Sequence, residues 1–306
     1  MEERLHLEVP QELEGSRVDR ALSVLMKVSR SVAREMVERG VILDGQPARA
    51  GQRVSAGSVL VAPPPPQPEM LAPEPVSFSV LYEDNDLIVV DKPAGVVVHP
   101  GAGHSRGTLA AGLLYRYPEL EGVGAAGRWG LIHRLDKDTS GVLVVARTEE
   151  SHRALTPMMG RREIRREYLA LVEGTFDAPT GTVDAPIGRH PTHPTRQAVV
   201  PAGRPARTHY EVERAYEEAG CSLLRVTLET GRTHQIRVHF AAIGHPVVGD
   251  RVYARSQSRV EAPRIFLHAR RVELAHPRTG DRLEVEAPLP DDLAEVLAVL
   301  EAENPE

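Results

Sequence analysis

The stretch "GLIHRLDKDTSGVLVVAR", residues 130–147, places several charged side chains directly before an apolar segment. Residues 142–146 are short, rich in valine and bounded by Gly141 and Arg147, which predicts a buried β-strand. The charged residues 133–138 are therefore expected at the edge of a core. Such a position suits either a solvated turn or a functional site held by a rigid strand.

Asp136 has two interpretations within this stretch. An aspartate in a turn of this kind often hydrogen-bonds its own backbone and does nothing else, a role that suits Asp138 better. Arg134 and Lys137 are neighbours of Asp136 in the sequence. A cation within ion-pair reach would keep the Asp136 carboxylate ionised and preserve it as a nucleophile.

A proline-rich stretch divides the chain. Residues 62–75, "APPPPQPEMLAPEP", contain seven prolines, and such a composition is typical of an extended, semi-rigid spacer. We therefore predict a small domain at residues 1–62, a linker at 63–75 and a large domain at 76–306.

The small domain is predicted to hold two helices and a short hairpin. Ser16 is a candidate N-cap of the first helix, Ser29 or Ser31 of the second, and Gly40 follows the second helix. The net charge of the whole chain is -6, but residues 15–62 hold eight basic and four acidic residues. This local excess favours contact with nucleic acid. The exposed helix face is expected to carry Arg17, Arg20, Lys27, Arg30 and Arg34.

The large domain mixes strand-like and helical patterns without regular alternation. Extended segments are predicted at 87–90, 96–98, 168–172, 208–212 and 222–228, and helices are predicted to begin at Thr148 and Thr233. An α+β fold with a mixed, largely antiparallel sheet fits this order better than a doubly wound parallel sheet.

The composition indicates a cytoplasmic protein. The N-terminus is acidic and polar, no apolar run has the length of a membrane span, and Cys221 is the single cysteine.

Other classes of site have weak support. Residues 136–141 resemble the start of a calcium loop, but its twelfth position is Arg147 instead of glutamate. The 13 histidines form no recognised zinc motif, and neither GxSxG nor GxxxxGK[ST] is present. Pairs such as His133 with Asp136, His190 with His193, or His234 with His239 are poor ligand sets, so no metal is expected.

Several motifs resemble the RluA-type pseudouridine synthase family, in the RluD-like branch that modifies large-subunit ribosomal RNA. They are "HRLDKDTSGVLVVAR" at 133–147, "DKPAGVVVHP" at 91–100, "REYLALVEG" at 166–174, "GRTHQIRVHFAAIGHPVVGDRVY" at 231–253 and "FLHARRVELAHP" at 266–277. Residues 15–62 resemble the S-four domain, a small αL RNA-binding domain found in a ribosomal protein.

The resemblance implies an enzyme that isomerises uridine in RNA without a cofactor. It implies that Asp136 is the nucleophile, toward either ribose or uracil, and that Arg237 pairs with it. Tyr168 would stack on the uracil, Leu267 would line the base pocket and Arg134 would help to flip the nucleotide out. The partner would be large-subunit rRNA, free or within a pre-ribosomal particle, and the enzyme a monomer.

Two other functions stay open from the residues alone. A non-catalytic RNA-binding protein would need only the small domain, and would have no use for Asp136 and its partners. A metal-dependent hydrolase would lose its activity in the presence of a chelator, although the spacing of the histidines speaks against it.

Overall fold

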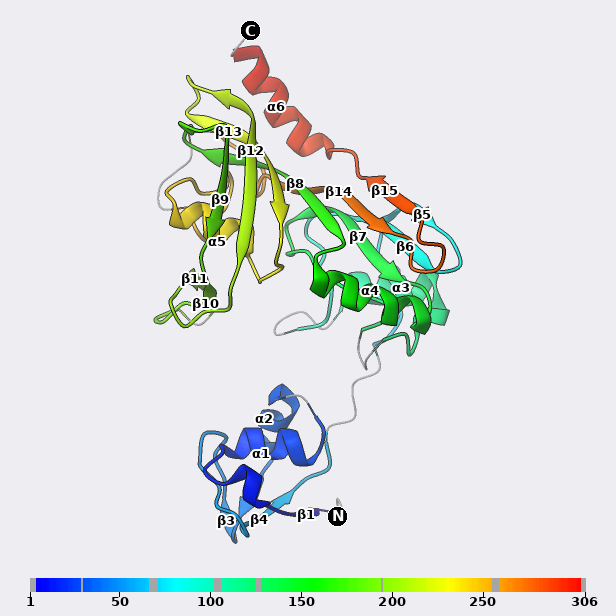
Figure 1. The fold of residues 1–306 in the computed structure, drawn as a ribbon, viewed down its shortest axis with the longest axis vertical. Helices are drawn as coiled ribbons and strands as arrows, with labels where there is room; N and C mark the ends of the chain where they lie inside the picture. Colours follow the sequence, from blue (N-terminus) through cyan, green and yellow to red (C-terminus); the bar gives the residue numbers. More distant parts are fainter. Residues whose placement is uncertain are drawn as a thin grey trace. The chain divides into compact units, whose positions relative to one another are not determined.

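The chain forms two compact units, Met1–Met70 and Leu71–Glu306, in a computed structural model (Figure 1). The structure describes residues 4–28, 30–65, 71–101, 106–124, 128–193, 195–254 and 259–303. The division falls inside the proline-rich stretch, five residues before the predicted start of the large domain.

The first unit packs two helices on a four-stranded sheet with the order β1-β4-β2-β3. The helices are α1 (Val18–Leu25) and α2 (Arg30–Glu38), and η1 (Gln11–Leu13) is a single 3₁₀ turn. The strands are β1 (Leu5–Glu8), β2 (Ile42–Leu43), β3 (Gln46–Pro47) and β4 (Val59–Ala62). The buried faces of both helices and of β4 form one apolar core.

Two predictions for this unit need correction. The residue before α1 is Arg17, which has extended backbone and makes no side-chain cap, so Ser16 is not the N-cap. The strand β1 was not predicted, because its four residues "LHLE" look like an exposed terminus until they pair with β4. Ser29 lies outside the described residues.

A nine-stranded sheet forms the centre of the second unit, and it confirms the predicted α+β class with a mixed, largely antiparallel sheet. Its order is β5-β6-β7-β14-β8-β13-β12-β9, with β15 paired to β14. The strands are β5 (Ser79–Glu83), β6 (Leu87–Lys92), β7 (Ser140–Ala146), β8 (Arg165–Glu173), β9 (Thr180–Asp184), β12 (Arg207–Tyr216), β13 (Cys221–Leu228), β14 (Leu267–Ala275) and β15 (Arg282–Glu286). A separate pair is formed by β10 (Ile187–Arg189) and β11 (Gln197–Val199).

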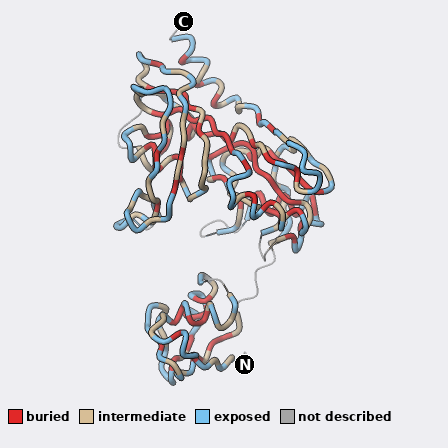
Figure 2. Tube along the Cα trace, in the orientation of Figure 1, coloured by how far each residue is buried: buried red, intermediate tan, exposed pale blue. Residues whose placement is uncertain are grey.

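Helices cover both faces of this sheet. They are α3 (Leu109–Arg116), α4 (Glu149–Arg161), α5 (Gln235–Ala242) and α6 (Asp291–Glu303), with a 3₁₀ turn η2 (Pro118–Leu120). Residues of α3 and α5 share one apolar core on one face, whereas α4 and α6 contribute to cores on the opposite face. The central strands are therefore buried on both sides (Figure 2), which explains the continuous apolar run in β7.

Among the described strands of this sheet, β7 and β14 form the one parallel pair, and their pairing is short. Strand β14 meets β7 at two residue pairs, His268 with Ser140 and Ala269 with Gly141. The same strand pairs with β8 over a much longer antiparallel stretch. The sheet thus consists of a β5–β7 side and a β14–β8–β13–β12–β9 side that join along this short seam.

Local boundaries differ from the predictions in three places. Strand β7 begins at Ser140, two residues before the apolar run. Residues 96–98 are not a strand; the carbonyls of Val97 and Val98 accept N–H bonds from the first turn of α3. Helix α5 begins at Gln235, two residues after Thr233. The predicted cap of α4 is confirmed, because the Thr148 side chain accepts the N–H of Ser151.

Among the described helices, none combines the length and the apolar composition that crossing a membrane requires.

Candidate active site

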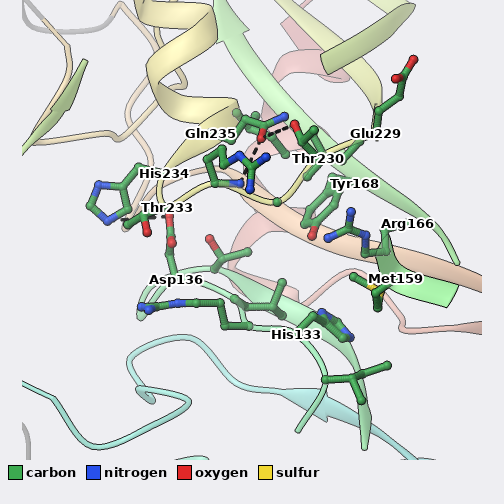
Figure 3. A pocket seen from close by; sticks show the side chains of 18 of the residues that line it. His133, Asp136, Met159, Arg166, Tyr168, Glu229, Thr230, Thr233, His234 and Gln235 are labelled. Atoms are coloured by element: carbon green, nitrogen blue, oxygen red, sulfur yellow. Dashed lines mark hydrogen bonds and ion pairs between the residues drawn. The ribbon is translucent and has the colours of Figure 1, made fainter. Parts of the chain in front are cut away.

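The charged stretch before β7 forms the wall of a cavity of about 500 Å³ (Figure 3). Thr139 closes a turn by donating its N–H to the Asp136 carbonyl at 3.2 Å. Asp136 is half-buried and faces the cavity, whereas Lys137 and Asp138 are exposed and do not line it. Of the charged residues in this turn, Asp136 therefore forms part of the cavity wall, whereas Lys137 and Asp138 are solvated.

Gly141 shapes this turn where it enters β7. Its φ is +113°, and a Cβ there would lie 2.1 Å from the carbonyl oxygen of Ala269. Only glycine permits this close approach of β7 to β14. The position of the Asp136 loop therefore depends on the missing side chain.

Arg237, on α5, is the predicted partner of Asp136, and the structure places the two side chains together. Its Nη1 lies 3.3 Å from Asp136 Oδ2, and the rest of the guanidinium forms a bidentate pair with Asp250 at 2.7 and 2.9 Å. Burial alone would lower the pKa of Arg237, but the Asp250 and Asp136 carboxylates outweigh it and raise the pKa above its usual range. The guanidinium is a permanent cation that links two carboxylates.

Tyr168 and Leu267 line the same cavity from neighbouring strands. Both residues are buried, on β8 and β14 respectively. Burial raises the pKa of the Tyr168 phenol, with Arg166 opposing the shift and Asp136 adding to it, so the hydroxyl is protonated at neutral pH. Arg134 lies at the exposed rim of the cavity.

Neither Asp250 nor His234 was assigned a role beside Asp136 from the sequence alone. Asp250 and Arg237 both lie in the motif at 231–253, but their pairing was not predicted. His234 has a left-handed backbone, its Nδ1 hydrogen-bonds the Tyr253 hydroxyl at 2.8 Å, and its Nε2 is 4.0 Å from Asp136 Oδ2. Burial lowers the pKa of His234 although Asp136 opposes this, so the imidazole is neutral at pH 7.

Two further residues hold the Asp136 loop from behind. His133 Nε2 accepts the backbone N–H of Val144 at 2.9 Å, so this histidine connects the loop to β7. Lys92 is fully buried, and its ammonium group donates to the carbonyls of Pro93, Val96 and Lys137 at 2.7, 2.9 and 3.0 Å. Burial lowers the pKa of Lys92 to about 7, against the opposing effects of Asp138 and Asp136.

The arginines that follow α4 separate into different environments. Arg161 pairs with Glu163, and Arg162 pairs with Glu229. Arg165 is exposed and outside the cavity, whereas Arg166 is buried and lines it.

The basic residues of the first unit are partly engaged within that unit. Arg17 and Arg30 both pair with the buried Asp19, at 3.1 and 3.2 Å, while 51% and 59% of their side-chain surfaces stay exposed. Arg34 lies 3.7 Å from Glu38. Arg20 and Lys27 are exposed. The Arg30–Asp19 pair therefore connects α2 to α1, and both arginines still offer cationic surface.

The histidine pairs considered as metal ligands have other hydrogen bonds. His239 bonds Thr208 and the Ala185 carbonyl, and His190 accepts backbone N–H bonds through Nδ1. Among the described residues, one group has metal-ligand spacing, namely Asp84, Asp86 and His276. Its carboxylates already bind Tyr82, Ser151 and Arg278.

Comparison with known proteins agrees with this geometry. A family model described as RNA pseudouridylate synthase matches residues 86–242. "Ribosomal large subunit pseudouridine synthase D" of Nitrosomonas europaea is 44% identical over 98% of this chain and 88% of that protein. An "Uncharacterized RNA pseudouridine synthase" of Chloroflexus aurantiacus is 48% identical over 96% of this chain and 92% of its own length. The solved structure of human RNA Pseudouridylate Synthase Domain Containing 1 covers 76% of this chain and 98% of its own, with 28% identity and a TM-score of 0.56.

Proposed function

We propose that this chain, which belongs to the RNA pseudouridylate synthase family, isomerises specific uridines of large-subunit ribosomal RNA to pseudouridine. One observation carries the proposal: Asp136 meets Arg237 at 3.3 Å on the wall of a cavity that Tyr168 and Leu267 also line. These are the residues that the family motifs assigned to the reaction. The similarity to enzymes named for the large ribosomal subunit supports the choice of RNA.

The reaction moves a bond within one nucleotide. The bond from ribose C1′ to uracil N1 breaks, the base turns, C1′ joins C5, and the proton of C5 is replaced by one on N1. No electrons are gained or lost and no group is transferred to a second molecule, so the chemistry requires no redox or group-carrying cofactor. Asp136 supplies the nucleophile, toward C1′ or toward the uracil ring.

The surrounding residues position the base and the carboxylate. The fixed cation of Arg237 lies 3.3 Å from Asp136 Oδ2 and orients the carboxylate. Tyr168 and Leu267 offer an aromatic and an aliphatic surface for the uracil. Arg134, at the rim, occupies the space that a flipped nucleotide vacates and offsets an unstacking cost of a few kcal/mol.

The first unit binds RNA in this proposal, as an S-four-like domain. Its exposed cations on α1 and α2 contact phosphates without reading sequence. The protein acts in the cytoplasm, as a monomer, on rRNA that is free or already part of a pre-ribosomal particle.

Mapping pseudouridines tests the proposal directly. Large-subunit rRNA from cells with and without this protein should differ at defined uridines, and the purified protein should restore them on an unmodified transcript. Asp136→Asn should abolish product while binding RNA normally, because an amide is a far weaker nucleophile. Asp138→Asn is the matched control, since this exposed neighbour in the same turn lies outside the cavity. Product formation by purified Asp136→Asn would refute the assignment.

A further inference from the structure

Arg166 is a buried cation for which the described part of the chain provides no ion-pair partner. The residue is 8% exposed and lines the cavity from β8. Its Nε is buried and makes no hydrogen bond, and no ion pair joins its guanidinium to any of the residues that the structure describes. Arg161 and Arg162, which lie nearby in the sequence, both have carboxylate partners.

The carboxylates of the cavity are already committed elsewhere. Asp136 accepts from Arg237, and Glu229 accepts from Arg162 and His209. Burying an ion without a counter-charge costs several kcal/mol, and an arginine cannot avoid this cost by losing its proton. No described residue supplies a charge that balances Arg166, so its side of the cavity suits an anionic ligand.

The position of Arg166 indicates which part of a ligand it meets. It lies two residues before Tyr168 on the same strand, so both side chains leave the same face. Gly231, in the loop after β13, approaches it closely, since a Cβ there would lie 3.0 Å from Arg166 Nη1. Figure 3 shows Arg166 beside Tyr168 and on the side of the cavity away from His234 and Asp136. An anionic group of a nucleotide that reaches past Tyr168 to this side of the cavity would meet Arg166.

His133 offers a second unused donor at this end of the cavity. Because its Nε2 accepts the Val144 N–H, the proton of the neutral ring lies on Nδ1. Burial, with a contribution from Arg166, lowers the pKa of His133 to about 3, so the ring stays neutral. Nδ1 is buried and has no partner among the described residues. A neutral N–H and a guanidinium together suit an oxygen-rich anion.

We propose that Arg166, assisted by the Nδ1–H of His133, binds a phosphodiester group adjoining the target uridine. This inference rests on the proposed function, since it places the uridine against Tyr168. A phosphate fits better than a uracil carbonyl, because only the phosphate carries a full negative charge, which would balance the charge of the buried guanidinium. The cavity as a whole has the same bias, with two carboxylates against six arginines: Arg128, Arg134, Arg162, Arg166, Arg232 and Arg237.

The first experiment needs no turnover. Binding of uridine and of uridine 3′,5′-bisphosphate is measured by NMR titration for the wild type, Arg166→Gln and Arg165→Gln. The bisphosphate should bind the wild type at least about tenfold more tightly than uridine, and Arg166→Gln should lose most of that preference. Arg165→Gln is the matched control, because it removes the same charge from the adjacent exposed residue outside the cavity. An equal preference in wild type and Arg166→Gln would overturn the inference.

The second experiment locates the phosphate in RNA. Short RNAs that contain the mapped uridine carry one uncharged methylphosphonate at each flanking position in turn. One position should weaken wild-type binding by about tenfold or more, and the same substitution should have little effect on Arg166→Gln. Independent losses in variant and RNA at every position would show that Arg166 meets some other group. Arg166→Lys, which keeps the charge without the planar fork, should retain part of the effect.

These tests distinguish a loss of folding from a loss of phosphate binding. Arg166→Gln should unfold at or above the wild-type temperature, since it removes an unpaired buried charge. Failure of the proposed function would appear as wild-type protein that forms no pseudouridine. Failure of this inference would appear as active wild type in which Arg166 and phosphate substitutions do not couple.

Discussion

Asp250 holds Arg237 through two parallel hydrogen bonds from Nε and Nη2, and this directs Nη1 of the guanidinium toward Asp136. Asp250 is in turn fixed by the backbone N–H groups of Val252 and Tyr253, which donate to its Oδ1 at 2.9 and 3.2 Å. The orientation of the cation beside the nucleophile is therefore set by a carboxylate that does not line the cavity.

Asp250→Asn should reduce kcat by about 10- to 100-fold and leave RNA affinity within about twofold. The amide cannot accept both N–H bonds, so Arg237 loses its fixed orientation and one buried charge loses its partner. Single-turnover rates and binding isotherms measure the two effects separately. Asp184→Asn is the control, because it breaks an exposed pair with Arg207 away from the cavity. An unchanged kcat in Asp250→Asn would contradict this role.

Gly141→Ala should destabilise the protein by more than about 3 kcal/mol and abolish activity. The new Cβ would require β7 to move from Ala269, and the backbone at φ +113° disfavours any side chain. Urea unfolding monitored by circular dichroism gives the stability change. Gly101→Ala, at an exposed position with open space around Cβ, should differ from wild type by less than about 1 kcal/mol. Wild-type stability in Gly141→Ala would show that the close approach is not required.

Lys92 should make stability rise with pH above neutrality. Its folded pKa is about 7, below the unfolded value of about 10.4, so the unfolded chain binds more protons between these values. Because of Lys92, the unfolding free energy should rise by up to about 1.4 kcal/mol per pH unit in that window, and this slope should vanish below pH 7. Unfolding free energies of wild type and Lys92→Met at pH 7.5, 8.25 and 9 isolate it by difference. Parallel curves for the two proteins would refute it.

Lys92→Met should also lower stability throughout this window. At these pH values Lys92 is mainly a neutral amine, and its removal takes this side-chain donor from the carbonyls of Pro93, Val96 and Lys137, the last of which is next to the nucleophile. Each lost bond costs about 1 kcal/mol.

Removing residues 1–70 should weaken RNA binding more than it slows chemistry on bound RNA. Asp136, Tyr168 and Arg237 all belong to the second compact unit. Rates at saturating RNA should change by less than about threefold, the half-saturating concentration should rise, and the salt dependence of binding should become shallower. Equal affinity and equal salt slope for the truncated and full chains would show that the first unit makes no phosphate contacts.

A chelator should leave activity unchanged once the RNA is folded. The isomerisation needs no Lewis acid, and the carboxylates of the Asp84–Asp86–His276 group are already hydrogen-bonded to protein partners. Rates are compared in EDTA with pre-folded RNA. A rate lost in chelator and restored by one particular metal ion would overturn this expectation.

The sequence was informative wherever a short motif carried the signal. Apolar patterning located most strands, and the resemblance placed Asp136, Tyr168, Arg237 and Leu267, all of which the structure brings to one cavity. It did not reveal the pairing of Asp250 with Arg237, which depends on how the loop after α5 folds back, or the unpaired state of Arg166, which depends on which distant segments surround it. The strand β1 was missed for the same reason, since its pairing with β4 spans the whole first unit.

The short seam between β7 and β14 has a consequence for cohesion. Asp136 belongs to one side of the seam, and Arg237, Tyr168 and Leu267 belong to the other. Few backbone pairings join the two sides, although both sides contribute to shared apolar cores, so an RNA bound across the seam would add a further connection between the two parts of the sheet. A bound RNA should therefore protect the seam from protease cleavage and from amide exchange more strongly than it protects the outer strands. Bound RNA would then stabilise the relative positions of the active-site residues on the two sides of the seam.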